Sequence, residues 1–175
     1  AFDDYGSPEL QVAGLVIKHE QGRLYDRFRD RVMFPIVNHK GEVIAFGGRV
    51  LGQGEPKYLN SPETPLFEKG REVFGLPQAR AAIRQSNAVI VVEGYLDVVA
   101  LSQHGLGNVV ATLGTATTVM HVQKLLRQAE RIVFCFDGDS PGRKAAWRAL
   151  ENSLDALTEQ KSIAFAFLPD GDDPD

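Results

Sequence analysis

Unbroken apolar runs alternate with segments of helical spacing throughout residues 87–175. Such runs are typical of strands that are buried on both faces, as in a parallel sheet covered by helices. Strands separated by helical segments predict an α/β fold with a doubly wound parallel sheet and right-handed crossovers. The runs predicted as strands are 88–92, 108–112, 132–136 and 162–168.

Glycines and capping residues set the expected helix boundaries in this part of the chain. Gly105 stops the helix that follows the first strand, and Ser140-Pro141-Gly142 opens the last helical stretch. The expected helices span 95–104, from Thr117 or Thr118 to about Glu130, and 143–157.

Residues 1–86 have a more mixed pattern, which predicts a smaller α+β subdomain. Two apolar segments, 32–37 and 43–46, flank a polar turn and predict a β-hairpin, with Pro35 at an edge or a bulge. Residues 52–71 are rich in proline and glycine and predict a long loop. The other expected elements are a short helix over 9–17, an extended segment over 25–31 and a helix from about Pro77 to Gln85.

Composition limits the classes of protein that fit. The chain has 175 residues, of which 43% are hydrophobic, and no apolar run approaches the length of a membrane span. Its single cysteine, Cys135, excludes an internal disulfide and a cysteine-cluster zinc site, and a cytoplasmic location is expected. The polar start at Asp3-Asp4 and the acidic end at Asp175 indicate a piece cut from a longer chain.

Charge is unevenly distributed along the chain, whose net charge is −4. Residues 1–85 hold 12 lysines and arginines against 11 acids, whereas residues 86–175 hold 7 against 12. An acidic half can collect cations, and a more basic half can hold phosphates. The overall acidity therefore does not exclude nucleic acid as a partner.

Carboxylates follow three of the predicted strands. Glu93 ends the first, Asp137 and Asp139 end the third, and the run from Asp170 to Asp175 follows the fourth. Because parallel strands bring their carboxyl ends to one edge of a sheet, these acids are expected to meet there. Like charges ~4 Å apart repel by ~4 kcal/mol at an effective dielectric of ~20, so one or two divalent ions such as Mg²⁺ are predicted between them. For any one cluster, an ordinary turn with an aspartate helix cap is the alternative.

Basic and aromatic residues gather in the first half. Arg27, Arg29 and Arg31 alternate and would share one face of an extended backbone. Arg49 follows Gly47-Gly48, where a backbone can pass close to a ligand. These features suit phosphate binding, but a solvated polar segment and a β-bulge without a ligand are equally open. The loop adds residues that can neutralise phosphate, stack on a base or bond to a sugar: Lys57, Tyr58, Asn60, Lys69 and Arg71.

Several segments, in order along the chain, carry a family resemblance. They read Y-D-R-F-R-D-R-V-M-F-P-I from Tyr25, F-G-G-R-V-L from Phe46, P-K-Y-L-N-S-P-E-T from Pro56, V-V-E-G-Y-L-D-V-V-A-L from Val91 and F-D-G-D-S-P-G-R-K-A-A from Phe136. The acidic segments resemble the Toprim domain of primases, topoisomerases and some nucleases. The whole series is similar to the RNA-polymerase core of bacterial replicative primases of the DnaG type.

This resemblance implies a Toprim domain over 87–175, preceded by a basic subdomain over 1–86. It implies metal positions at Glu93, Asp97, Asp137, Asp139, Asp173 and Asp175. Of these, Glu93, Asp137 and Asp139 are the catalytic candidates, and Glu93 is also a candidate for proton transfer. The family's groove for template and nucleotide matches Arg49, Lys57, Tyr58, Asn60 and Lys69, together with Arg27 and Arg29.

The activity that the resemblance implies is synthesis of short RNA primers from ribonucleoside triphosphates on a single-stranded DNA template. It implies two or more Mg²⁺ ions, which Mn²⁺ can replace, and no zinc in this part of the chain. The implied partners at bacterial replication forks are the template, the ribonucleotides and the primer–DNA hybrid. The replicative helicase and the single-stranded DNA-binding protein would bind through regions that this sequence does not contain.

Two alternatives stay open at the level of sequence. A Toprim nuclease or topoisomerase fragment would share the acidic edge but would cleave DNA, although nothing marks Tyr5, Tyr25, Tyr58 or Tyr95 as a topoisomerase nucleophile. A non-catalytic, metal-dependent binding module, such as a phosphorylation receiver, would require neither the basic loop nor the carboxylate of Glu93.

Overall fold

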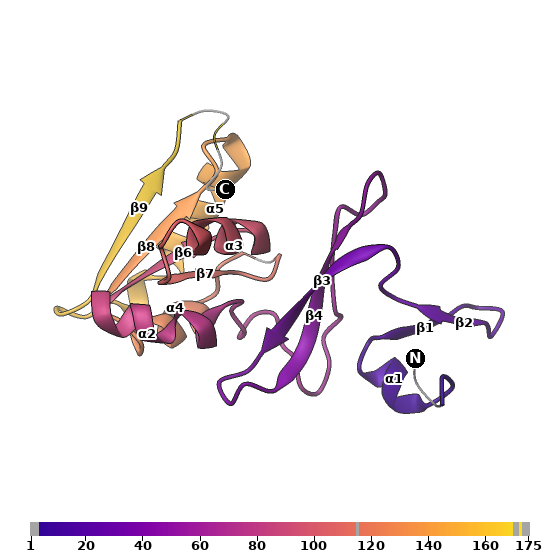
Figure 1. Cartoon of the computed structure of the whole chain (residues 1–175). Helices are drawn as coiled ribbons and strands as arrows, with labels where there is room; N and C mark the ends of the chain where they lie inside the picture. Colours follow the sequence, from indigo (N-terminus) through magenta and orange to yellow (C-terminus); the bar gives the residue numbers. More distant parts are fainter. Residues whose placement is uncertain (1–3, 115, 170–171, 173–175) are drawn as a thin grey trace. The chain divides into compact units, whose positions relative to one another are not determined.

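The computed structural model describes residues 4–114, 116–169 and 172. The chain forms two compact units (Figure 1). The first comprises residues 1–38 and 42–68, and the second comprises residues 39–41 and 69–175.

The first unit begins with a short helix and a two-stranded ribbon. Helix α1 covers Pro8–Val12, and the antiparallel strands β1 and β2 cover Val16–Lys18 and Leu24–Asp26. The expected helix over 9–17 is therefore wrong in its second half. Gly14 has a left-handed conformation, with φ of +69°, which ends the helical turn and directs the chain into β1.

A three-stranded antiparallel sheet completes this unit. Strands β3 (Arg31–Val37) and β4 (Val43–Val50) pair as the expected hairpin, and β5 (Tyr58–Asn60) pairs with β4 on its other side. Pro35 lies on the edge strand β3, where its missing N–H disrupts no ladder within the sheet. The strand register also shifts between Ile36 and Val37, close to Pro35. Because β3 and β4 pair antiparallel, the hairpin prediction is confirmed.

Two expectations for this sheet need correction. Strand β4 continues to Val50, so Gly47, Gly48 and Arg49 lie inside the strand rather than after it. Residues 52–71 are not one loop, because β5 forms within them by pairing with this part of β4. A Cβ on Gly48 would lie 3.0 Å from Phe28 and 3.1 Å from Arg31, so side chains of the same unit already explain a glycine there.

The second unit is the expected α/β domain. Its four strands are parallel and lie in the order β7-β6-β8-β9 (Figure 1). The predicted doubly wound sheet is therefore confirmed. The strands are β6 (Ala88–Val92), β7 (Val109–Ala111), β8 (Arg131–Phe136) and β9 (Ser162–Phe167).

The helices of this unit are α2 (Leu76–Ser86), α3 (Tyr95–Gln103), α4 (Val119–Leu126), α5 (Ser140–Glu151) and the 3₁₀ helix η1 (Leu154–Ala156). Thr118 caps α4, which ends earlier than expected. Helix α5 begins at Ser140 rather than Arg143, because Asp139 caps it and Pro141 suits the first helical turn. Over the described ranges, no helix has the length and apolar character that crossing a membrane requires.

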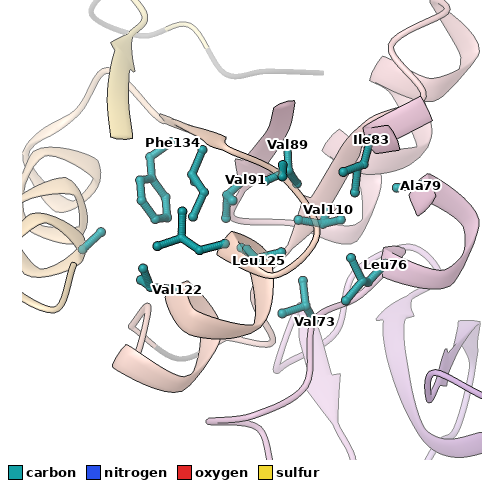
Figure 2. Packing of buried hydrophobic residues seen from close by; sticks show 14 of the residues in the cluster. Val73, Leu76, Ala79, Ile83, Val89, Val91, Val110, Val122, Leu125 and Phe134 are labelled. Atoms are coloured by element: carbon teal, nitrogen blue, oxygen red, sulfur yellow. The ribbon is translucent and has the colours of Figure 1, made fainter. Parts of the chain in front are cut away.

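Alternate strand residues pack against helices on opposite faces of the sheet. On one face, Val89, Val91 and Phe134 share a core with side chains of α2, α4 and α5. Figure 2 shows Val89 and Val91 beside Ile83 of α2 and Leu125 of α4. On the other face, Val92, Val109 and Ala111 pack with Val98 of α3. Burial on both faces explains why these strands read as unbroken apolar runs.

Helix α2 belongs to the core of the second unit through Leu76, Ala79 and Ile83. The compact units accordingly divide at residues 68 and 69. The sequence pattern instead predicts a domain boundary between residues 86 and 87. That boundary stays a prediction, because the division at residues 68 and 69 describes compact units of the structure.

Chain topology determines where a ligand fits on this sheet. From β6 the chain crosses through α3 to β7, then returns through α4 to β8 on the other side of β6. The direction of winding therefore reverses between β6 and β8. Open α/β sheets bind ligands at the carboxyl ends of the strands at such a switch point. Glu93 follows β6 and Asp137 follows β8, so both acids lie at this point.

Candidate functional site

The carboxyl ends of β6 and β8 bring two acidic residues together. The parallel register pairs Val91 with Phe134, so Glu93 comes level with Phe136 and one residue before Asp137. The backbone N–H of Asp137 donates a hydrogen bond to the Glu93 carboxyl group. The two strand ends that were expected to meet therefore do so.

Glu93 lies in an unfavourable environment for a negative charge, although the residue as a whole is exposed. Partial burial of the carboxyl group raises the pKa of Glu93 above its ordinary value, and the charges of Asp137, Asp139 and Asp97 raise it further. The hydrogen bond from Asp137 acts in the opposite direction. Because a bound cation relieves such repulsion, these carboxylates together favour a positive ion.

Two of these acids also cap helices. Asp139 accepts a hydrogen bond of 2.8 Å from the N–H of Gly142 at the start of α5. Asp97 accepts one of 2.8 Å from the N–H of Gly94 at the start of α3. The aspartate-cap alternative is therefore correct for Asp139. It does not compete with metal binding, because an ionised carboxylate has about four lone-pair sites.

The turn that contains Asp137 and Asp139 packs against the chain after β9. A Cβ on Gly138 would lie 2.3 Å from the carbonyl oxygen of Pro169 and 2.6 Å from that of Leu168. The N–H of Gly138 also lies 3.5 Å from the carbonyl oxygen of Asp172. Asp172, the one described residue of the late acidic run, thus lies beside this turn. The predicted metal positions Asp173 and Asp175, like Asp170, lie outside the described residues.

Within residues 4–114, 116–169 and 172, no three His, Cys, Asp or Glu side chains are arranged to hold a metal ion. The fit to a metal comes instead from the chemistry of the donors. They are carboxylate oxygens, and Glu93 is repelled by three like charges. Hard oxygen donors of this kind suit Mg²⁺ and Mn²⁺. The roles of Glu93, Asp97, Asp137 and Asp139 as metal ligands stay a prediction.

A pocket of about 510 Å³ opens at the same edge of the sheet. Glu93, Thr112 and Phe136, which end or follow three neighbouring strands, line it together with Lys144 and Arg148 of α5. Sequence reasoning missed these two cations. Their spacing of four residues, on a helix that begins at the acidic turn, was the signal that places both on one side of that helix.

A buried histidine holds the segment that carries Lys69. His121 is fully buried in the first turn of α4. Its Nε2–H donates to the carbonyl of Lys69 at 2.8 Å, and its Nδ1 accepts from the N–H of Thr118 at 3.2 Å. The hydroxyl of Thr118 donates to the carbonyl of Gly70 at 2.6 Å. The start of α4 therefore fixes the backbone at residues 69 and 70.

Stability of the chain is expected to decrease as the pH falls below about 6.5, because of His121. Burial lowers the pKa of His121 below its ordinary value of 6.5, so the unfolded chain binds a proton that the folded chain excludes. The free energy of unfolding therefore decreases progressively as the pH falls from 6.5 through the lowered pKa of His121. Denaturant titrations between about pH 5 and 8 should show this slope, and His121→Gln, which keeps an acceptor for the cap, should flatten it. Equal slopes for both proteins would argue against this role.

Three predicted nucleic-acid-binding residues cluster on the sheet of the first unit. Arg49 of β4 and Tyr58 of β5 are cross-strand partners. The guanidinium carbon of Arg49 lies 5.9 Å from the centre of the Tyr58 ring, and Lys57 Nζ lies 5.8 Å from it. The Tyr58 side chain is 39% exposed. An accessible ring with two adjacent cations suits stacking and charge neutralisation on a single strand.

Arg27, Arg29 and Asn60 have different surroundings. Arg27 donates from Nε and Nη2 to the carbonyl of Asn60, at 3.3 and 3.2 Å. The guanidinium carbon of Arg29 lies 5.2 Å from the ring centre of Tyr25. The chain bends after β2 and Asp30 is left-handed, with φ of +51°, so the alternating arginines do not share one face. That expectation is wrong, and Arg27 joins two segments within the first unit.

Comparison with known proteins identifies the family. The protein-family model for the N-terminal domain of the DNA primase catalytic core matches residues 3–80. The family model for the Toprim domain matches residues 87–165. The DNA primase of Neisseria meningitidis serogroup A is 60% identical over 174 residues, which is 99% of this chain. The chain belongs to the catalytic core of the DnaG-type bacterial DNA primases. Its Toprim domain implies binding of divalent metal in general.

Solved primase structures have the same fold. The Escherichia coli primase catalytic core matches with a TM-score of 0.91 and 54% identity, over 97% of this chain and 55% of that one. The DnaG primase catalytic domain in a structure bound to single-stranded DNA matches with a TM-score of 0.90 and 53% identity, over 97% of this chain and 56% of that one. The expected family and fold class are confirmed. This chain spans 29% of the length of the Neisseria primase.

The match over residues 3–80 decides between the alternatives raised by the sequence. Toprim domains are shared with nucleases and topoisomerases, whereas this first match is to a domain of the primase core. The basic β4–β5 cluster and the acidic strand ends thus both belong to a primase core.

Proposed function

We propose that this chain contributes the metal centre and part of the template surface to a primase that makes RNA primers from ribonucleoside triphosphates. The observation that carries this proposal is the meeting of Glu93 with Asp137, Asp139 and Asp97 at the switch point of the Toprim sheet. Single-stranded DNA as the template is supported by the relative whose structure was solved bound to it.

The proposed ligands of two or more Mg²⁺ ions, which Mn²⁺ can replace, are Glu93, Asp97, Asp137 and Asp139, with Asp173 and Asp175 from outside the described residues. Bound ions of this kind neutralise charge on a transferring nucleotide. The contribution of the chain itself is positioning, since strand ends and helix caps hold the carboxylates in place. Glu93, whose pKa is raised, is also the candidate for proton transfer.

Template binding is assigned to the cluster of Arg49, Lys57 and Tyr58. The cations would neutralise phosphates, and the ring would stack on a base. Lys69, whose backbone carbonyl accepts a hydrogen bond from His121, is proposed as a further phosphate-binding residue. The other proposed contributors are Asn60, Arg27 and Arg29.

Tyr58→Ala is expected to weaken binding of a single-stranded oligonucleotide about tenfold. Stacking of a base on an aromatic ring contributes about 1–3 kcal/mol, and the remaining cations would still hold the backbone. Fluorescence anisotropy at fixed salt measures the change. Tyr5→Ala, which removes another exposed tyrosine of the first unit, is the matched control. Equal losses in both variants would show that Tyr58 has no specific role.

Primer synthesis by a full-length primase that carries this core tests the function as a whole. With single-stranded template, labelled ribonucleotides and Mg²⁺, short RNA products are expected, and chelation of the metal should abolish them. Supercoiled plasmid in a parallel reaction detects DNA cleavage. Nicked plasmid without RNA products would contradict the proposed function.

A further inference from the structure

The cap and the first two turns of α4 contact one irregular segment of the chain, residues 69–72. The three residues that make these contacts follow one another at intervals of three, so they share one side of the helix. The members of this α4 anchor are Thr118, His121 and Lys124. Two of them donate hydrogen bonds to the carbonyl oxygens of Lys69 and Gly70. The third forms an ion pair with Glu72, in which 2.9 Å separates the ammonium nitrogen from a carboxylate oxygen.

The anchor depends on a neutral imidazole ring. Because Nδ1 of His121 accepts from the N–H of Thr118, the ring hydrogen lies on Nε2, from which it is donated to the Lys69 carbonyl. His121 is fully buried, and this burial favours the neutral ring by lowering its pKa. The charged groups beside the ring are those of Lys124 and Glu72. One side chain thus connects the helix cap to the segment in a single protonation state.

The segment is also fixed where it enters the core. Val73 is buried in the main hydrophobic cluster. Phe74 exchanges two backbone hydrogen bonds with Ala111, at the end of β7, of 2.9 and 3.1 Å. Residues 69–72 are therefore held by α4 and, directly after them, by β7. Contacts at both places restrict the backbone, so the side chains of the segment project from a defined position.

The anchored segment carries a cation to the acidic edge of the sheet. Thr117, which precedes the helix cap, lines the pocket at the carboxyl ends of the strands together with Glu93. Because Thr118 bonds to the carbonyl of Gly70, the backbone next to Lys69 lies near that edge. The Lys69 residue itself is half-buried.

We propose that Thr118, His121 and Lys124 are positioning residues for Lys69, whose backbone they hold so that its ammonium group meets a phosphate of a nucleic-acid strand. The proposal rests on the phosphate-binding role proposed for Lys69. A segment that must be ordered during binding lowers affinity, whereas a segment that is already ordered does not. The anchor residues act through Lys69 and need not contact the nucleic acid.

Binding of a single-stranded oligonucleotide to a full-length primase that carries this core tests the proposal. Fluorescence anisotropy at fixed salt measures the affinity. Lys69→Ala should weaken binding about tenfold, because a charge-assisted contact to phosphate is lost. Thr118→Val removes the hydroxyl with little change of shape and should weaken binding about threefold. Thr118→Ser keeps the hydroxyl and should bind as the unaltered protein does.

The double variant Lys69→Ala/Thr118→Val distinguishes positioning from a general loss of stability. If the anchor acts through Lys69, removal of the hydroxyl should have no further effect once the lysine side chain is absent. A destabilised fold would instead weaken binding by the same factor with and without that side chain. Equal factors would overturn the proposal, as would an unchanged affinity of Thr118→Val.

Glu72→Ala tests the anchor without altering the helix cap or the core, so it also decides the case in which Thr118→Val does not fold. The substitution removes the partner of Lys124 and one negative charge. Charge alone would strengthen binding to a polyanion, whereas loss of the ion pair should weaken it about twofold. Tighter binding would overturn the proposal. Glu159→Ala, which removes another exposed acid, is the matched control and should not weaken binding.

Lys69→Ala separates failure of the anchor from failure of the proposed function. If Lys69→Ala leaves the affinity unchanged, the phosphate-binding role of Lys69 is wrong, and the positioning proposal is wrong with it. If Lys69→Ala weakens binding while Thr118→Val and Glu72→Ala do not, only the positioning proposal is wrong.

Discussion

Glu93→Gln, in a full-length primase that carries this core, is expected to lower primer synthesis at least about a hundredfold while leaving the fold intact. Loss of one preorganised charged group at a transition state commonly has an effect of about this size. The amide has nearly the shape of the carboxyl group, but it cannot provide a negative charge to a metal or take up a proton. Primer yield and Mn²⁺ affinity measure the two consequences.

The same substitution should not destabilise the metal-free protein. Because the pKa of Glu93 is raised, its ionised form opposes folding, and stability falls as the pH rises from the ordinary 4.5 through the raised value. Glutamine does not ionise, so it does not contribute this pH-dependent loss of stability. The variant should therefore be at least as stable as the unaltered chain at neutral pH. Glu159→Gln, an exposed acid far along the chain, is the control. Normal primer yield from Glu93→Gln would refute the catalytic role.

Gly138→Ala is expected to destabilise the chain by about 1–3 kcal/mol and to weaken Mn²⁺ binding. Its Cβ would lie 2.3 Å from the Pro169 carbonyl oxygen and 2.6 Å from that of Leu168, so backbone must move to make room. The movement would separate the acidic turn from the chain that leads into the late acidic run. Denaturant unfolding and a Mn²⁺ titration measure the two effects.

Gly70→Ala is the matched control for that substitution. Its added Cβ would make only an ordinary contact, 3.6 Å from a methyl group of Thr118. If Gly138→Ala were as stable as Gly70→Ala and bound Mn²⁺ equally well, the packing of the turn against residues 168 and 169 would have no part in the site.

The α/β domain could be predicted because strands that are buried on both faces appear in the sequence as continuous apolar runs. Ala88–Val92 and Arg131–Phe136 are strands whose alternate residues contact helices on opposite sides, so nearly every position is apolar. Strand β5 does not appear as an apolar run in the sequence. Tyr58–Asn60 is short and lies among prolines and glycines, and its structure depends on pairing with β4. The turn at Gly14 likewise depends on one backbone conformation.

The acidic site could be predicted in outline because parallel strands bring their ends to one edge. What the sequence pattern did not reveal is the second role of individual residues. Asp97 and Asp139 cap helices, and Arg27 bonds to a backbone carbonyl. The sequence did not predict that Lys144 and Arg148 line a pocket, because two exposed cations on a helix have the same sequence pattern whether or not a pocket lies beside them.

Anomalous diffraction from crystals of this chain soaked in Mn²⁺ measures directly whether the acidic strand ends bind divalent metal. We expect a manganese peak bonded to carboxylate oxygens of Glu93 and Asp137, at the carboxyl ends of β6 and β8. A manganese-free edge at millimolar Mn²⁺, with both carboxylates facing only solvent, would contradict a metal centre at this position.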